Sequence, residues 1–354
     1  MMFDRLDRYI ARNVLSAMLV VQVLILGLDL VITYINDLSD IEGDYGAFDV
    51  LLYLLMRLPW RFYEYVPVGV LLGALLGLGS MASSNELTVM RAAGRSLTRI
   101  LWGVMKPLGL VIVLTMVVGE FVAPQTEQYA NAWRTVKQEG AGAVTAQGGG
   151  WQREGDSFYR FGSIRSDNTI ISVDRYHFDG QRLDEALHAD RAVYDNGTWQ
   201  LQDVRITHLT AEATRAETLP SMTWQTSMQP DLLRLVITDK ESQSLRDLWR
   251  YGNYLQSQGT SASSVWLYFW QKVLQPLVLA GLVLVAASFI FGPLRTVAAG
   301  TRVFYGIVTG LVFKYTQDLL APASTVFGFS PIWAVLAPTI ICFALGLMML
   351  RRTG

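Results

Sequence analysis

The chain has 354 residues, of which 51% are hydrophobic and 17% are charged, and its formal net charge is −1. This balance is typical of a membrane protein and gives no indication of nucleic-acid binding, for which a strongly basic chain is expected. Cys342 is the single cysteine, which excludes a disulfide framework within the chain and a cysteine-based metal site.

Six apolar runs of about 20 residues predict membrane-spanning helices, because a helix of that length crosses the hydrocarbon core of a bilayer. The first run carries Asp29 and lacks a small-residue cleavage site, so we interpret it as a retained helix and not as a removable signal peptide. The predicted spans are residues 14–35, 64–82, 100–122, 265–291, 298–320 and 331–350.

Arginines gather in the loops on one side of these spans, and the opposite side is acidic. Residues 36–50, on the opposite side, carry five acidic residues and neither Lys nor Arg. Because cytoplasmic loops carry an excess of Lys and Arg, both termini and the loop 83–99 are predicted to be cytoplasmic. The arginines on that side are Arg5, Arg8, Arg12, Arg91, Arg95, Arg99, Arg295, Arg302, Arg351 and Arg352.

Two arginines lie in the apolar run 50–63 on the outer side. Arg57 and Arg61 flank Pro59. They indicate either an interfacial helix with its basic groups near the lipid headgroups or a kinked extension of the second span. The sequence is compatible with both.

One face of the first span is polar. Gln22, Asp29 and Thr33 recur at helical spacing, with Leu26 in the same row. A polar group in hydrocarbon is costly, about 2.5–3.5 kcal/mol for a central Asp on insertion scales, so this face is expected to look into a cavity or onto another helix. A helix-packing face in which Asp29 snorkels to the outer interface is the alternative.

Glycines recur at a spacing of four in the second span. Gly69, Gly73 and Gly77 leave one face of this helix nearly bare of side chains. Small residues at that spacing allow helices to approach closely in a membrane. The face is expected to be either a packed pivot beside a partner helix or an ordinary contact within the chain.

The charged segment 83–99 is placed between two spans and can form a short helix. Ser83 or Ser84 is predicted to be the N-cap, and Gly94 is predicted to end the helix. An exposed apolar pair surrounded by charges suits docking into a groove of another protein, although a surface connector fits the same pattern. The residues of this predicted contact are Glu86, Leu87, Met90, Arg91 and Gly94.

Between the third and fourth spans the chain is polar, with short alternating runs and turn signals such as Asp195-Asn196-Gly197. This pattern predicts an all-β domain on the outer side of the membrane, inserted between two groups of three helices. Residues 141–150 indicate a flexible entry, and residues 245–256 a helix leading back to the membrane. The predicted domains are 1–124, 125–262 and 263–354.

The fifth span repeats the polar pattern of the first. Ile307, Gly310, Lys314 and Gln317 fall on one face, with Phe313 beside them. Lys314 and Asp29 reach similar depths at about 1.5 Å of rise per residue. Lys314 is therefore predicted to contact an anionic lipid headgroup, to pair with Asp29, or to snorkel to the outer interface.

The sequence gives little support to an enzyme. It contains no Gly-x-x-x-x-Gly-Lys-Ser/Thr phosphate loop, no His-Glu-x-x-His and no Gly-x-Ser-x-Gly. His177, His188 and His208 lie in the predicted β domain without metal-ligand spacing. We expect that this chain binds no cofactor or metal and that energy comes from another chain.

Several segments resemble a known family. They are Gly73-Ala-Leu-Leu-Gly-Leu-Gly79, the loop with Asn85-Glu86-Leu87, Met90 and Ala93-Gly94, the Val122-Ala-Pro-Gln125 exit from the third helix, and Ser288-Phe-Ile-Phe-Gly-Pro-Leu-Arg295. With the Leu6-Asp7-Arg8-Tyr9 start and the layout of three helices, a β domain and three helices, they resemble the LptF/LptG permeases of the lipopolysaccharide export ABC transporter. The resemblance covers essentially the whole chain, and the last segment is most similar to the G-type subunit (LptG).

The resemblance implies a heterodimer with an F-type permease subunit and a cytoplasmic ATPase dimer bound through the loop after the second helix. ATP and Mg²⁺ would be held by the ATPase. The complex would extract lipopolysaccharide from the outer leaflet of the bacterial inner membrane, and the β domain would be a periplasmic jellyroll that joins a lipid bridge. A single-span auxiliary subunit is also known in the family.

The resemblance also assigns residues. The coupling helix would use Glu86, Leu87, Met90, Arg91 and Gly94, and the first and fifth helices would line lateral gates. The corresponding gate residues are Gln22, Leu26, Asp29, Thr33, Ile307, Gly310, Phe313, Lys314 and Gln317.

The outer end of the first helix departs from the family. Some members carry lysines there, suited to substrate phosphates, whereas this chain has Thr33, Ser39 and Asp40. Lys314 could supply the missing charge. The alternatives to this exporter are a lipoprotein-release permease, whose large domain typically follows the first helix, a membrane enzyme using Asp29, and a structural periplasmic tether.

Overall fold

The computed structural model describes residues 5–41, 43–139, 151–164, 169–195, 197–210, 213–224, 226, 228–292 and 297–353. The chain forms two compact units. The helical unit comprises Met1–Asn36, Arg57–Thr126 and Ser263–Gly354, and the sheet unit comprises Asp37–Met56 and Glu127–Ala262. The predicted flexible entry at 141–150 and the loop residue Arg295 lie outside the described residues.

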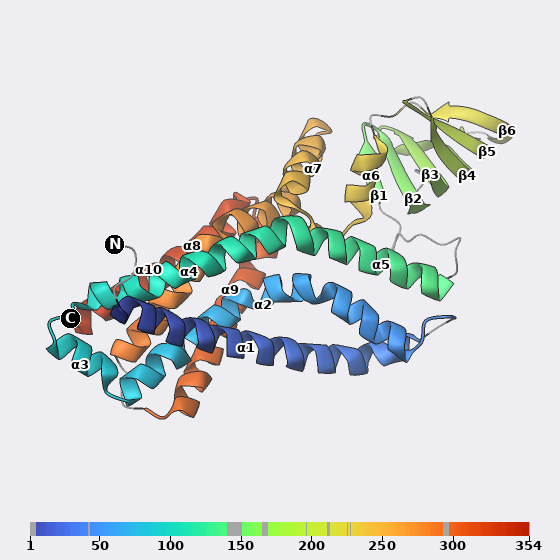
Figure 1. Cartoon of the computed structure of the whole chain (residues 1–354). Helices are drawn as coiled ribbons and strands as arrows, with labels where there is room; N and C mark the ends of the chain where they lie inside the picture. Colours follow the sequence, from blue (N-terminus) through green and yellow to red (C-terminus); the bar gives the residue numbers. More distant parts are fainter. Residues whose placement is uncertain are drawn as a thin grey trace. The chain divides into compact units, whose positions relative to one another are not determined.

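Long helices build the helical unit, and α2 and α5 contribute residues to both units (Figure 1). A 3₁₀ turn, η1 (Leu38–Asp40), follows α1, and a π-helical stretch, η2 (Val118–Val122), joins α4 to α5. The helices are α1 (Arg5–Asp37), α2 (Ala47–Ser83), α3 (Glu86–Ala92), α4 (Leu97–Val117), α5 (Ala123–Glu139), α8 (Ser263–Phe291), α9 (Ala299–Val326) and α10 (Pro331–Thr353).

Five helical stretches of the described chain are long and apolar enough to cross a membrane: Arg5–Asp40, Ala47–Ser83, Leu97–Arg134, Ser263–Phe291 and Pro331–Arg352. Helix α9, which covers the predicted fifth span, is 28 residues long but is not in this group. Its polar residues Lys314, Gln317 and Asp318 lower its mean hydropathy. A sixth crossing therefore stays a prediction.

Helix α2 continues through both of its prolines. Pro59 and Pro67 lie inside Ala47–Ser83, and Arg57 and Arg61 belong to the same helix. The segment 50–63 is thus an extension of the second predicted span and not a separate interfacial helix. Proline removes one backbone hydrogen bond from a helix interior, which membrane helices tolerate when neighbouring groups satisfy the freed carbonyl.

The glycine row of α2 packs directly on α1. A Cβ added at Gly69 would meet Oε1 of Gln22 at 2.0 Å, and one added at Gly73 would meet the Cα of Met18 at 2.4 Å. At Gly77 the same atom would lie 2.9 Å from the Cα of Val14. The partners on α1 repeat at the same spacing of four; the two helix backbones are in contact at Gly73 and Gly77, and the Gln22 side chain fills the space at Gly69. The glycine face is an ordinary contact within the chain.

The core of the helical unit is built mainly from α1, α2, α4 and α8. Leu71, Leu75 and Leu78 of α2 are completely buried in it, as is Val283 of α8. Helix α8 also packs closely on α10, where a Cβ at Gly281 would lie 3.2 Å from the Phe343 ring. Helix α8 is therefore a central element of the unit.

The sheet unit contains one antiparallel sheet in which all six described strands pair in sequence order (Figure 1). The antiparallel sheet predicted from alternating residues is confirmed, and the unit also contains helical segments. The strands are β1 (Trp151–Glu154), β2 (Ser157–Ile164), β3 (Thr169–Asp179), β4 (Arg182–Asp195), β5 (Thr198–Leu209) and β6 (Thr214–Trp224).

Aromatic side chains show that this sheet curls on itself. Trp224 of β6 lies 5.2 Å from Tyr159 and 5.9 Å from Phe161 between ring centroids, although β6 and β2 are not neighbours in the sheet. Thr226, just after β6, donates a 2.7 Å hydrogen bond to Glu154 at the end of β1. The buried rings form the centre of an apolar interior. Jellyroll-like closure of the domain stays a prediction.

Two helices, α6 (Pro230–Ile237) and α7 (Leu245–Ser257), and the 3₁₀ turn η3 (Lys240–Ser242) follow the sheet. The predicted helix at 245–256 is confirmed. It follows the N-cap Ser244, whose hydroxyl oxygen accepts a 3.1 Å hydrogen bond from the backbone N–H of Asp247. The assignment of Asp37–Met56 to the sheet unit was not indicated by composition, and the three domain boundaries expected above stay predictions.

We expect Gly73→Ala to lower the free energy of unfolding by about 1–3 kcal/mol, because its new Cβ would overlap the backbone of Met18. The measurement is the thermal unfolding midpoint of the purified chain in detergent. Gly109→Ala in α4 is the matched control, since a Cβ there would meet nothing within 4 Å. Equal midpoints for the two variants would contradict the backbone contact.

Candidate functional site

Helix α3 is a short helix with sharply defined ends. It begins after Asn85, which has a left-handed φ of 63°, and it is followed by Gly94 with φ of 85°. The Gly94 N–H donates to Arg91 O at 3.0 Å and the Arg95 N–H donates to Met90 O at 3.1 Å, which is the Schellman pattern. Gly94 ends the helix as predicted, but the prediction of Ser83 or Ser84 as N-cap was wrong.

The apolar pair of α3 faces inward. Leu87 is 3% exposed and Met90 7% exposed, and both pack in the core of the helical unit. The prediction of an exposed Leu87–Met90 face was therefore wrong, because a seven-residue helix gains more by burying its own apolar side against its neighbours. Val89 is 65% exposed, and Thr88 and Arg91 are exposed with it.

Glu86 lies in the first turn of α3. Its Oε1 accepts a 2.9 Å hydrogen bond from the Ser84 hydroxyl. Its Oε2 is buried and has no hydrogen-bond partner among the described residues. A carboxylate oxygen that is shielded from water without a donor is costly.

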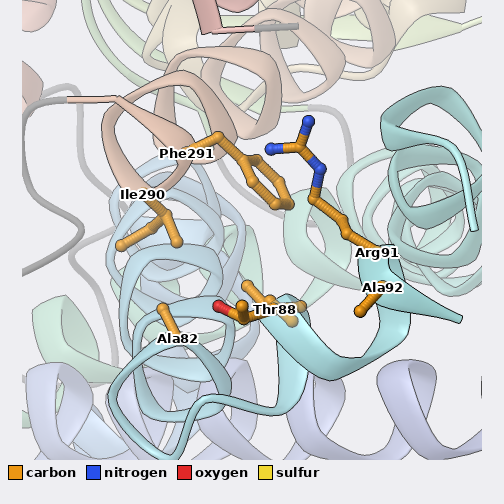
Figure 2. A pocket seen from close by; sticks show the side chains of 7 residues that line it. Ala82, Thr88, Arg91, Ala92, Ile290 and Phe291 are labelled. Atoms are coloured by element: carbon orange, nitrogen blue, oxygen red, sulfur yellow. The ribbon is translucent and has the colours of Figure 1, made fainter.

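A pocket of about 400 Å³ opens beside α3. Figure 2 shows the Phe291 ring and the Arg91 side chain along one side of it, with Ala82, Thr88 and Ala92 on the other. Ile290 and Phe291 come from the C-terminal end of α8. The structure thus brings together the segment 83–94 and part of the segment 288–295, which are far apart in the sequence.

The polar face of α1 is satisfied by α2. Gln22 is buried and its Nε2 donates to Phe62 O at 3.3 Å. Asp29 accepts a 2.7 Å hydrogen bond from the Tyr65 hydroxyl, and its Oδ2 lies 3.5 Å from Nε of Arg61. Leu26 and Thr33 are partly buried in the same row. At Gln22 and Asp29 this face is therefore a helix-packing face.

Of the three alternatives left open for Lys314, the pair with Asp29 is contradicted by the structure. The Nζ of Lys314 lies 3.4 Å from Oδ2 of Asp318, one turn later on α9, and Lys314 is 59% exposed. Arg61 lies one turn before Tyr65 on α2, so both can reach Asp29 from the helix that already packs on α1. Each charge is thus neutralised by a near neighbour.

The other predicted residues of α9 divide between the core and the surface. Phe313 is buried in the core, and a Cβ at Gly310 would lie 3.4 Å from Leu71 of α2. Ile307 is exposed and Gln317 is partly buried. The face that carries Lys314 therefore points away from the core of the helical unit.

Three charged sites were missed by the sequence interpretation. The first is Asp7 on α1, which is buried and pairs with Arg95 and with Nζ of Lys106 at 2.6 Å. Asp7 stands three and seven residues before Ile10 and Val14 in the buried stripe of α1. The sequence feature that could have predicted this site is a carboxylate at a position where the helical periodicity places a buried apolar residue.

The second missed site is Lys272 of α8, which is 6% exposed. Its Nζ donates to Gly119 O of the π-helical stretch at 3.1 Å and lies 5.3 Å from the centroid of the Tyr63 ring. A lysine within the apolar run 265–291 was the signal. A π-helical turn exposes a carbonyl that a buried cation can bind.

The third missed site surrounds Arg134 in the sheet unit. Its guanidinium lies 5.6 Å from the centroid of the Tyr45 ring and 5.0 Å from that of Tyr53, and its Nη2 donates to Asp40 at 2.7 Å. Burial raises the pKa of Tyr45 to about 12, so this phenol faces the cation as a neutral ring. These residues are far apart in the sequence, and no local pattern predicts that they are in contact.

Known proteins resemble this chain over its full length. The family "Lipopolysaccharide export system permease LptF/LptG" matches residues 8–352. The chain belongs to the LptF/LptG family. It is 35% identical to the lipopolysaccharide export system permease protein LptG of Escherichia coli (strain K12), over 99% of both chains. It is 32% identical to the protein of the same name from Haemophilus influenzae, also over 99% of both chains.

This membership confirms the resemblance carried by the four segments quoted from the sequence. Both relatives are named as permeases, which are transport subunits and not enzymes. The described part of this LptF/LptG-family chain contains no group of three or more His, Cys, Asp or Glu residues that could hold a metal ion. His177 instead hydrogen-bonds Ser157 at 3.0 Å, and His188 contacts Asp174 at 2.6 Å.

A double-mutant cycle tests the partner of Asp29. We expect Asp29→Asn and Arg61→Gln to show a coupling energy of about 0.5–3 kcal/mol, because residues in direct contact are not additive. Asp29→Asn and Lys314→Gln are expected to add within about 0.3–0.5 kcal/mol. The measurement is the free energy of unfolding in detergent. Coupling to Lys314 in place of Arg61 would overturn the observed pairing.

Proposed function

We propose that the chain is a permease subunit of an ABC transporter that extracts lipopolysaccharide from the outer leaflet of the bacterial inner membrane. The observation that carries this function is α3, a short helix between two membrane-type helices that buries Leu87 and Met90 and leaves Val89 exposed. A helix fixed in this way can transmit force from an ATPase to the membrane helices. The relatives' names support lipopolysaccharide as the substrate.

The proposed topology has six crossings, with α9 as the fifth span, both termini in the cytoplasm and the sheet unit in the periplasm. The arginine distribution supports this orientation, since the N-terminus, the α3 loop and the C-terminus are all basic. A polar α9 fits a helix that faces protein or substrate more than lipid on one side. The proposed domains are 1–124, 125–262 and 263–354.

The exposed faces of α1 and α9 are proposed to line lateral gates against an F-type permease subunit. Val23, Leu24 and Leu28 of α1 are exposed, as are Val312 and Leu319 of α9. Apolar exposure suits either lipid or a partner helix, and Asp29 and Lys314 lie along the same two helices. Of the gate residues expected from the sequence, Leu26, Thr33, Ile307, Lys314 and Gln317 are proposed to face the gates, whereas Gln22, Asp29, Gly310 and Phe313 pack within the helical unit.

The sheet unit is proposed to be a jellyroll-like domain that receives lipid and passes it to a periplasmic bridge. The curled sheet with Tyr159, Phe161 and Trp224 inside supports this role, because acyl chains need an apolar interior. ATP and Mg²⁺ are proposed to bind the partner ATPase dimer, and this chain is proposed to hold no cofactor. A single-span auxiliary subunit completes the proposed assembly.

We expect Glu86→Ala to weaken association with the ATPase at least tenfold, about 1.4 kcal/mol, and to abolish lipopolysaccharide release. The physical reason is the loss of a charged side chain at the proposed docking surface. Association and release are measured on the complex in lipid nanodiscs. Glu217→Ala, on the exposed side of β6, is the control for association. Unchanged association and release for Glu86→Ala would favour the enzyme or tether interpretation.

Lys314 tests the proposed headgroup contact. We expect Lys314→Ala to lower the affinity of the complex for lipopolysaccharide by about tenfold, because it removes a cation that can pair with phosphate, and we expect Lys314→Arg to retain it. Binding to the detergent-solubilised complex is the measurement. Wild-type affinity for both variants would assign Lys314 to snorkelling or to its pair with Asp318.

A further inference from the structure

A buried carboxylate lies at the start of α1. Asp7 occupies the stripe that continues through Ile10, Val14 and Met18, all of which pack in the core. A buried carboxylate is costly unless cations and donors compensate it. Any function of Asp7 therefore depends on the groups that face it.

Two cations from the α3–α4 segment hold this carboxylate. Arg95 Nη2 pairs with Oδ1 of Asp7, and Lys106 Nζ pairs with Oδ2 at 2.6 Å. The side chains of Asp7 and Arg95 are both nearly inaccessible, whereas that of Lys106 is 36% exposed. The Arg95 pair is thus the more deeply buried of the two. Removing Asp7 would take this carboxylate away from the shielded Arg95 guanidinium, whereas removing Arg95 would leave Asp7 with Lys106.

Arg95 is attached rigidly to α3. Its backbone N–H donates to the carbonyl of Met90, and Met90 is itself packed in the core. The next residue, Ser96, caps α4 by accepting the N–H of Arg99 at 3.4 Å. The Arg95 side chain is buried where it meets Asp7, so movement of the C-terminal end of α3 acts directly on this pair.

Helix α1 can carry such a movement along its length. From Asp7 to Asp29 it extends about 33 Å at 1.5 Å per residue. Between these two carboxylates it packs on Gly77, Gly73 and Gly69 of α2. A Cβ added at any of these glycines would lie within 3 Å of an α1 atom. Near its other end Asp29 binds Tyr65 and Arg61. Packed helices with so little free space shift as bodies and do not deform locally.

We propose that Asp7 is a positioning residue for transport, because its ion pair with Arg95 couples the C-terminal end of α3 to α1. This inference rests on the proposed function, in which α3 contacts the ATPase and α1 lines a gate. The pair is a direct contact between α1 and the residues that join α3 to α4. Without it, hydrolysis at the ATPase continues, but α1 follows α3 less completely and less lipid is released for each ATP.

The test uses the complete complex in lipid nanodiscs, with lipopolysaccharide as substrate. Assembly, ATP hydrolysis and lipid released per ATP are measured for Asp7→Asn, Arg95→Met and the double variant. We expect assembly and at least half of wild-type hydrolysis in each single variant, with at least a fivefold fall in lipid released per ATP. The double variant is expected to lose no more than the worse single variant, because the two residues act as one unit.

Two control variants separate coupling from general damage. Asp7→Glu keeps the carboxylate and is expected to restore lipid released per ATP to within twofold of wild type. Arg12→Gln removes an exposed charge from the same helix and is expected to leave the ratio unchanged. If Asp7→Asn fails to assemble, Arg95→Met, which keeps a long apolar stem, decides the test.

The proposal is overturned if both single variants keep the wild-type ratio, or if hydrolysis and release fall in parallel so that the ratio does not move. The second result would assign Asp7 a structural role only. Glu86→Ala measured alongside distinguishes the two proposals. If Glu86→Ala does not weaken ATPase association, the proposed function itself is contradicted. If Glu86→Ala weakens association but the Asp7 and Arg95 variants keep the wild-type ratio, only this inference is contradicted.

Discussion

The helical unit depends on the close approach of α1 and α2. Lipid gives no hydrophobic driving force for helix association, so membrane helices are held by packing and by polar contacts. The glycines at 69, 73 and 77 bring the α2 backbone onto Val14, Met18 and Gln22 of α1. A side chain at Gly73 or Gly77 would meet the α1 backbone and separate the helices. The polar groups of α1 reach their partners on α2 because the two helices lie this close together.

That approach brings Asp29 to its partners on α2, and Asp7 finds its partners in α4 and just before it. Asp29 binds Tyr65 and Arg61 of α2, and Asp7 binds Arg95 and Lys106. Each pair satisfies a carboxylate that hydrocarbon or protein would otherwise leave without water. Lys314 of α9 pairs within its own helix and stays exposed. The two predicted polar faces therefore differ in character, since that of α1 is largely used for packing and that of α9 is open.

Periodic features were predictable from the sequence, and contacts between distant residues were not. Apolar length predicted α1, α2, α4, α8 and α10, and alternation with turn signals predicted a β domain, because both patterns depend on neighbours along the chain. Gly94 was recognisable as a helix end because only its own backbone conformation decides it. The inward side of α3, the Arg61 partner of Asp29 and the site around Lys272 depend on which helices meet, which one sequence does not specify. The pocket beside α3 could not be predicted for the same reason, since its lining combines residues about 200 positions apart in the sequence.

The burial of Leu87 and Met90 determines how α3 can act. A helix whose apolar side faced a partner could tilt independently of the membrane helices and would lose little packing in doing so. Here that side is part of the core, so tilting α3 alone would expose apolar surface at about 25 cal/mol per Å² and open a cavity beneath it. Moving α3 together with α2, α4 and the Asp7 end of α1 preserves those contacts. The less costly response to a force on Val89 and Arg91 is therefore a displacement of the packed group of helices, which is the motion that a gate between membrane helices requires.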